Sequence, residues 1–236
     1  MIPRTISILI LCGLPLNLYV YAIDITDIIG EEKEIEVYLR TEYNRGFGGC
    51  GDLSVIGNIK PRKIFTVRAG LSAGNLSTGV DDIKAFSSAD ADPFSNIPLR
   101  FSLLYTYNGL LYYDVHTHSI LPVVSYGIAR VRVSYGPNFR FTSFFGETAQ
   151  RELINSFSVY VNIINGEKRQ MEAVVGNFCD FYARNMGAYS LKVNYAVFIT
   201  GNWTVVNEVE LLQSGSDALA ADFYGLAWRG GAKYSW

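Results

Sequence analysis

Residues 223–236, FYGLAWRGGAKYSW, decide the fold because their side chains separate by parity. In a β-strand successive side chains point to opposite faces, so a pattern that repeats every two residues predicts a strand. Arg229, Lys233 and Ser235 occupy one face of the predicted strand. The other face is aromatic, aliphatic or small, and carries Tyr224, Leu226, Trp228, Gly230, Ala232, Tyr234 and Trp236.

Gly231, Tyr234 and Trp236 have a recognisable spacing: a glycine, two residues, an aromatic, one residue and a terminal aromatic. This spacing resembles the C-terminal signature of bacterial outer-membrane β-barrel proteins, although no family within that superfamily is identified by it. The resemblance implies an all-β, membrane-spanning, antiparallel up-and-down barrel in the bacterial outer membrane. In that superfamily the barrel-assembly machinery recognises the closing strand, and the resemblance implies the same route for this chain.

The same alternation extends through most of the chain, and no segment of comparable length has helical spacing. In the first such segment, Ile35, Val37 and Leu39 alternate with charged residues such as Glu36 and Arg40. One face of each segment is predicted to contact lipid and the other to enclose the lumen. The clearest segments are 34–43, 99–107, 130–141, 156–163, 189–199 and 205–211.

The strand number must be even if both chain ends lie in the periplasm. We predict ten strands, starting near residues 34, 64, 98, 115, 129, 153, 169, 188, 203 and 224. The acidic segment from Asn75 to Ile97 fits this count poorly, since it becomes a long periplasmic loop whereas long loops usually face outward. Twelve strands result if Leu53 to Lys60 and Leu110 to Val115 are also counted, and eight would require merging strands across evident turns.

The turns predict the orientation of the barrel. Gly127-Ile128, Asn165-Gly166-Glu167 and Gly201-Asn202 are short connections, and the last two have the Asn/Gly composition of tight hairpins. Longer connections follow each of them, at 145–151, 181–187 and 214–222. Because outer-membrane barrels have short periplasmic turns and longer outer loops, the short turns are predicted to lie in the periplasm.

The N-terminus has the pattern of a cleaved secretion signal covering residues 1–22, which leaves residues 23–236 as a single barrel domain. A basic start at Arg4 precedes the apolar stretch Ile6 to Leu18, and Val20-Tyr21-Ala22 offers a cleavage site. A retained anchor ranks lower because the chain turns polar immediately afterwards. Lipid modification of Cys12 ranks lower because bulky Leu11 precedes it.

Composition excludes several classes of protein. The 236 residues carry a formal net charge of −2, which disfavours nucleic-acid binding. After the first twenty residues no run of eighteen apolar residues could span a bilayer as a helix. The chain is rich in aromatics, with 16 Tyr, 14 Phe and 3 Trp, but has only two histidines, a mixture that favours strands over acid–base catalysis. No cofactor is expected.

Charged residues recur on the predicted inward face. Opposite charges on neighbouring strands are expected to pair into a ladder, with Glu208 and Glu210 between Lys192 and the last strand. Small barrels have interiors only just wide enough for side chains, so these charges are predicted to be structural rather than a selectivity filter. The predicted ladder contains Glu36, Arg40, Glu42, Arg100, Arg130, Arg132, Arg140, Lys192, Glu208, Glu210, Arg229 and Lys233.

Arg130, Arg132 and Arg140 form a basic group that would favour anions if a water path exists. Cys50 and Cys179 could pair in an oxidising compartment, but their pairing does not follow from sequence.

The segment 114–119, DVHTHS, superficially resembles the Asp/His pair of omptin proteases. The acidic pair that should partner it is not recognisable in the sequence, and two histidines are only a partial metal site. We therefore expect neither catalysis nor a metal there.

These observations predict a narrow outer-membrane channel or transporter for small solutes, in contact with outer-membrane lipid. The alternative is a surface-exposed structural or adhesive barrel with a plugged lumen, whose outer loops meet host ligands. A soluble secreted β-sandwich that binds ligands and a barrel hydrolase rank below both.

Overall fold

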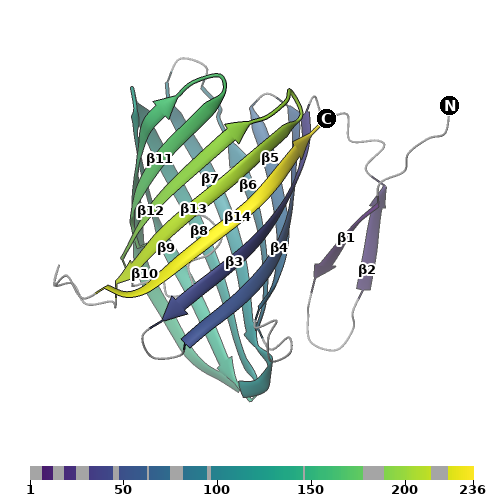
Figure 1. Ribbon diagram of the computed structural model, residues 1–236. Coiled ribbons are helices and arrows are strands. Elements are labelled where there is room, and N and C mark those ends of the chain that lie inside the picture. Colours follow the sequence, from purple (N-terminus) through teal and green to yellow (C-terminus); the bar gives the residue numbers. More distant parts are fainter. Residues whose placement is uncertain are drawn as a thin grey trace.

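The computed structural model describes residues 7–12, 19–24, 32–44, 48–62, 64–74, 82–94, 97–145, 147–177, 189–213 and 223–236. In the described residues, twelve antiparallel strands form one closed barrel in which each strand pairs with its neighbours in the chain (Figure 1). The strands are β3 (Glu32–Asn44), β4 (Gly48–Arg62), β5 (Phe65–Gly74), β6 (Asp82–Ala91), β7 (Leu99–Leu110), β8 (Val115–Ile128), β9 (Val131–Phe144), β10 (Glu147–Asn165), β11 (Arg169–Gly176), β12 (Ser190–Phe198), β13 (Trp203–Gln213) and β14 (Phe223–Ser235).

Twelve was the alternative to the favoured count of ten, and the two additional strands are β4 and β6. In β6 most outward residues are small, as at Ala85 and Ala89, while the bulky Phe86 is buried inside. The usual contrast between an apolar outer face and a polar inner face is therefore weak in the acidic segment that was expected to be a loop. Residues 111–113, by contrast, form a single 3-10 turn, η2 (Leu111–Tyr113), rather than a strand.

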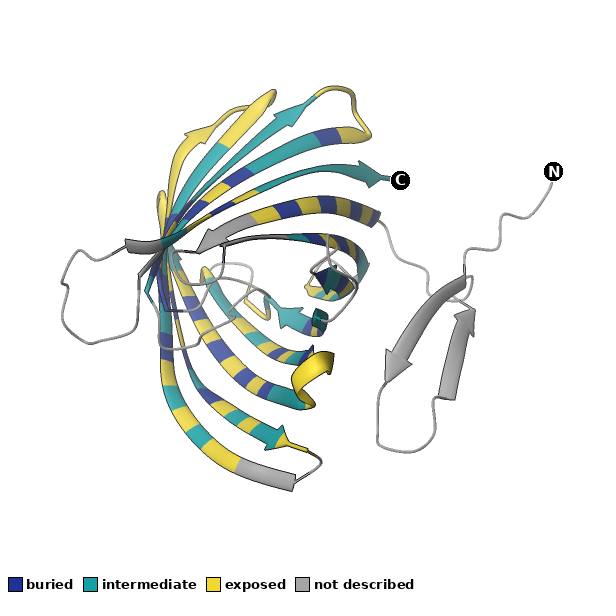
Figure 2. Cartoon of the chain, turned by 60° about the horizontal axis from the view of Figure 1, so that its bottom comes forward, coloured by how far each residue is buried: buried dark blue, intermediate teal, exposed yellow. Residues whose placement is uncertain are grey.

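The two faces of the sheet differ in the way that the alternation predicts. In β3, Ile35, Val37 and Leu39 are exposed, whereas the intervening Glu36 and Arg40 are buried. The same alternation of exposed and buried positions runs along many strands (Figure 2). The barrel thus has an apolar outer surface and a largely polar interior, the inverse of a soluble globular protein.

The last strand closes the barrel against the first. β14 pairs with β3 from Gly225↔Asn44 to Ser235↔Glu34. Beyond this ladder, the amide of Trp236 donates to the carbonyl of Lys33 at 2.9 Å, and the Lys33 amide donates to the Trp236 carbonyl at 3.1 Å. The strand that carries the C-terminal signature therefore completes the hydrogen bonding of the sheet, which leaves the barrel without a free edge.

The two ends of the barrel have different connections. One end, the turn end, holds the start of β3, the end of β14 and the connections at 63–64, 92–98, 129–130, 166–168 and 199–202. The opposite end, the loop end, holds the connections at 45–47, 75–81, 111–114, 145–146, 177–189 and 214–222. The three short turns identified in the sequence all lie at the turn end, although the first reverses at residues 129–130 and Gly127-Ile128 belong to the end of β8. The acidic segment 75–97 is divided by β6 between the two ends.

Residues Ser7–Cys12 (β1) and Tyr19–Asp24 (β2) form a separate two-stranded sheet, which among the described residues pairs with no strand of the barrel. Apart from Ile23 and Asp24, they belong to the segment 1–22 expected to be removed as a secretion signal, and its cleavage stays a prediction. No helix in the described part of the chain is long and apolar enough to cross a membrane.

Candidate functional site in the barrel lumen

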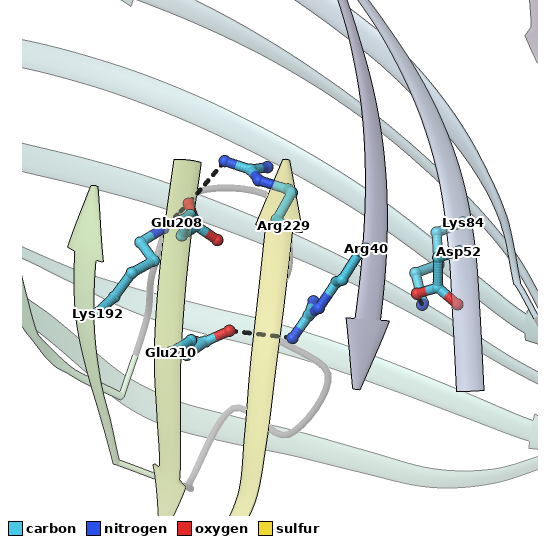
Figure 3. Close-up of polar contacts among 7 residues, drawn as sticks. All are labelled: Arg40, Asp52, Lys84, Lys192, Glu208, Glu210 and Arg229. Atoms are coloured by element: carbon cyan, nitrogen blue, oxygen red, sulfur yellow. Dashed lines mark hydrogen bonds and ion pairs between the residues drawn. The ribbon is translucent and has the colours of Figure 1, made fainter. Parts of the chain in front are cut away.

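A group of buried charges lines one wall of the lumen toward the loop end. These residues come from β12, β13, β14, β3, β4 and β6, and their side chains are largely shielded from water. Figure 3 shows most of them gathered across neighbouring strands. We call this group the charged belt; it consists of Lys192, Glu208, Glu210, Arg229, Arg40, Asp52, Lys84 and Asp82.

Glu208 lies at the centre of the belt between two cations. Arg229 Nη2 donates to Glu208 Oε2 at 2.7 Å, and Lys192 Nζ lies 3.5 Å from the same oxygen. The Glu208 side chain is only 5% exposed. In the register, Glu208 faces Arg229 on β14 directly, whereas Lys192 on β12 faces Glu210 and reaches Glu208 diagonally.

Three more ion pairs extend the belt along the wall. Arg40 reaches across β14 to Glu210 on β13, with Nη2 3.0 Å from Oε2 (Figure 3). On β6, Lys84 Nζ lies 3.0 Å from Asp52 Oδ2 and 2.9 Å from Asp82 Oδ2. Buried charges persist only when paired and hydrogen-bonded, and the belt meets this requirement through contacts between different strands.

A second set of inward ion pairs is partly exposed to water. Arg140 Nε donates to Glu152 Oε2 at 2.7 Å, and Arg132 Nη2 lies 3.9 Å from Glu172 Oε1, both on the wall formed by β9, β10 and β11. On the opposite side of the barrel, the pairs are Lys233–Glu34 at 2.6 Å and Arg68–Glu36 at 3.6 Å. The four cationic side chains are between 22% and 35% exposed, so water reaches them.

Apolar and aromatic side chains also enter the lumen, which the sequence analysis did not foresee. Tyr38, Ile56 and Phe86 form a buried cluster, and the Arg229 guanidinium stacks 4.3 Å from the centre of the Tyr38 ring. On the other wall, Arg132 lies 3.9 Å from the centre of the Tyr160 ring. These residues lie at inward positions of their strands, so parity places them in the lumen despite their apolar character.

The structure separates some members of the predicted ladder. Arg130 lies in the exposed turn between β8 and β9 rather than in the lumen, because the chain reverses at residues 129–130. Arg132 and Arg140 are eight residues apart, about 26 Å along a strand, and each has its own carboxylate, so the three arginines form no cluster. Arg100 makes a two-point contact with Asp92 at the turn end, at 2.8 and 2.7 Å.

Other predicted residues lie partly or wholly outside the described residues. Glu42 and Cys50 face one another in the register of β3 and β4, but their side chains are outside what the structure describes. Cys179 is outside the described residues altogether, and with it the pairing of the two cysteines.

The Asp/His segment lies on the outward face at the loop end. His116 Nε2 is 3.0 Å from Asp114 Oδ1, and its Nδ1 is 2.8 Å from the hydroxyl of Tyr107. His118 Nδ1 bonds the hydroxyl of Tyr105 at 2.8 Å. Both rings are thus held by tyrosines of β7, at the rim and away from the lumen. In the described residues no group of three or more His, Cys, Asp or Glu side chains could hold a metal ion.

Solved structures with a similar architecture are bacterial outer-membrane proteins. A KdgM porin in complex with disordered oligogalacturonate matches with a TM-score of 0.58, covering 86% of this chain and 99% of that chain at 8% identity. The fold is that of the outer-membrane β-barrels. An outer-membrane channel from Pseudomonas putida F1 matches with a TM-score of 0.53 at 11% identity, covering 88% of this chain and 96% of that chain.

The translocator domain of the autotransporter NalP from Neisseria meningitidis is also similar, with a TM-score of 0.50 and 12% identity over 88% of this chain and 90% of that chain. No protein-family model matches the chain. No curated protein matches it. The resemblance based on Gly231, Tyr234 and Trp236 is therefore confirmed at the level of the fold, and the family within the superfamily stays unidentified.

Proposed function

We propose that this chain is an outer-membrane barrel that conducts small hydrophilic solutes through a narrow lumen. The observation that carries the proposal is the inversion of the two faces, with apolar side chains outside and polar, charged side chains inside. Strands of the barrel reach or exceed the roughly 9–11 residues that a tilted strand needs to cross the bilayer, except for β11, which has eight. Outer-membrane lipid and the barrel-assembly machinery are its proposed partners.

The partly exposed inward pairs support a water path. Arg140 and Glu152 lie toward the loop end, while Arg132, Glu172 and Lys233 lie toward the turn end, and water reaches all of these side chains. The charged belt lies on the other wall, formed by β12 to β6, where its members pack against one another and narrow the lumen. The similar structures include a porin and a channel, not enzymes, and the absence of catalysis in this chain is part of the proposal.

Planar-bilayer recording tests this function. Purified protein refolded in detergent should insert and give discrete current steps in 1 M KCl, smaller than those of a wide sixteen-stranded porin recorded in parallel. Liposomes that contain the protein should swell in small sugars. A folded barrel that inserts, as shown by its resistance to protease in the liposomes, yet gives no steps and no swelling contradicts the proposal.

The burial of the charged belt favours one second candidate, a plugged barrel with a structural or adhesive role. Arg40 and Glu210 are only 3% and 7% exposed, which is the packing of a solid core rather than of a water-filled channel. Aromatic residues at the loop end, including Tyr112 and Phe145 at 80% and 79% exposure, would then supply the surface for a partner. The absence of conductance in the experiment above supports this candidate.

A further inference from the structure

The inward cations of the barrel share one property: each has a carboxylate within 4 Å. This holds for every lysine and arginine on the inward face of β3 to β14 whose side chain the structure describes. The pairs join different strands in most cases. They are Arg40–Glu210, Lys60–Glu32, Arg68–Glu36, Lys84–Asp52, Lys84–Asp82, Arg100–Asp92, Arg132–Glu172, Arg140–Glu152, Lys192–Glu208, Arg229–Glu208 and Lys233–Glu34.

Pairing decides what a passing solute experiences. An isolated charge in a narrow pore with low-dielectric walls attracts counter-ions strongly and repels ions of its own sign. A cation held against a carboxylate presents a dipole, whose potential falls off much faster with distance. A solute a few ångströms from such a pair therefore meets little net charge.

The water-accessible pairs have this arrangement on both sides of the barrel. Arg140–Glu152 and Arg132–Glu172 lie on the β9–β11 wall, and Arg68–Glu36 and Lys233–Glu34 lie opposite them. Neither wall offers a row of one charge sign that could guide an anion or a cation. Between the charges, the inward positions are uncharged: some are polar, as at Thr106, Asn108 and Thr142, and others are apolar or aromatic, as in the Tyr38 cluster.

We infer that the lumen is charge-compensated and selects for uncharged or zwitterionic polar solutes, such as small sugars or amino-acid zwitterions, rather than for anions or cations. The inference rests on the proposed channel function and gives it a substrate class. It also assigns a role to Glu152 and Glu172: each cancels the charge of an arginine that faces the water path.

Reversal potentials across a KCl gradient at low ionic strength test this inference, because high salt would screen the charges. The unmodified protein should give a ratio of K⁺ to Cl⁻ permeability within about twofold of one. Glu152→Gln and Glu172→Gln should each shift the ratio severalfold toward Cl⁻, since Arg140 and Arg132 lose their carboxylates. Glu167→Gln removes the same charge from an exposed turn outside the lumen and should leave the ratio unchanged.

The paired variant provides the decisive comparison. Arg140→Gln should shift the ratio toward K⁺, and Arg140→Gln combined with Glu152→Gln should return it close to that of the unmodified protein. Liposomes should swell faster in a hexose or in glycine than in the potassium salt of a sugar acid of similar size. A salt of the same sugar acid with a cation too large to enter the lumen serves as the control for cation entry. If Glu152→Gln fails to fold, Glu172→Gln provides the same test, because the Arg132–Glu172 contact is longer and its loss should disturb folding less.

The outcomes separate the two levels of the argument. Current steps with a selectivity of more than about tenfold for either ion overturn charge compensation but leave the proposed channel function intact. An unchanged ratio in both glutamine variants overturns the role of Glu152 and Glu172. No conductance from a folded, inserted barrel overturns the channel itself, and the inference with it.

Discussion

The ring of Tyr38 lies across Gly231, its opposite residue in the register of β3 and β14. A Cβ atom at residue 231 would overlap both the Tyr38 ring and the carbonyl oxygen of Val37. Only glycine fits without a shift of the neighbouring strand. The glycine of the C-terminal signature thus has a packing role at the seam where the first and last barrel strands meet, and Tyr38 in turn contributes to the apolar cluster with Ile56 and Phe86.

Replacing Gly231 should weaken closure of the barrel. Gly231→Ala forces the Tyr38 ring or the β3 backbone to move, a steric cost of about 1–3 kcal/mol. The folded fraction is read from the different gel mobility of boiled and unboiled samples. It should fall at a lower urea concentration in Gly231→Ala than in the unmodified protein. Gly201→Ala is the matched control, because nothing lies within 4 Å of a Cβ at that turn residue. Equal urea midpoints for the two variants would remove the packing role of Gly231.

Removing the carboxylate at the centre of the charged belt should destabilise the barrel more than the same change in a turn. Glu208→Gln leaves Lys192 and Arg229 without their shared counter-charge in a buried position, which costs about 3–5 kcal/mol. Glu167→Gln, in the exposed turn between β10 and β11, should change stability by less than about 0.5 kcal/mol. Urea unfolding in detergent measures both. A Glu208→Gln variant as stable as the turn variant would show that the belt does not hold the wall together.

The alternation predicted most of the strands because each has one strongly apolar face and one polar face. It failed at β6, where most outward side chains are small, and at β4, where Gly48, Gly49 and Gly51 begin the strand and Ile56 points inward. Chain order placed Glu208 between Lys192 and Arg229, since neighbouring strands pair in a meander. The sequence could not show that Arg40 reaches across β14, or that Asp52, Lys84 and Arg68 belong to the lumen, because those contacts depend on register and barrel curvature.

A charge placed on the outer face should carry a cost that depends on its depth. Val55, near the middle of β4, is an exposed outward residue, and Val55→Arg should cost about 2–4 kcal/mol if that face lies at the bilayer midplane. Ile128→Arg, at the turn end, should cost about 0–1 kcal/mol because the interface tolerates charge. Refolding into lipid vesicles at graded urea concentrations gives both values. Equal costs at the two positions would mean that Val55 does not lie deeper than Ile128.

The N-terminal segment offers an independent prediction. If residues 1–22 are a cleaved secretion signal, protein purified from the envelope should begin at Ile23. Intact-mass spectrometry and N-terminal sequencing determine the start directly. A chain that retains Met1 or begins at a lipid-modified Cys12 would contradict the proposed cleavage.

The most direct test of the whole account asks what the outward apolar face touches. In a variant without Cys12, Cys50 and Cys179, nitroxide labels attached to cysteines at 55 and 103 are compared with a label at 167 after reconstitution in bilayers. Power-saturation measurements should show that the labels at 55 and 103 are accessible to oxygen but not to a water-soluble nickel complex, whereas the label at 167 is accessible to nickel. Nickel accessibility at 55 and 103 equal to that at 167 would contradict the claim that this face lies against lipid.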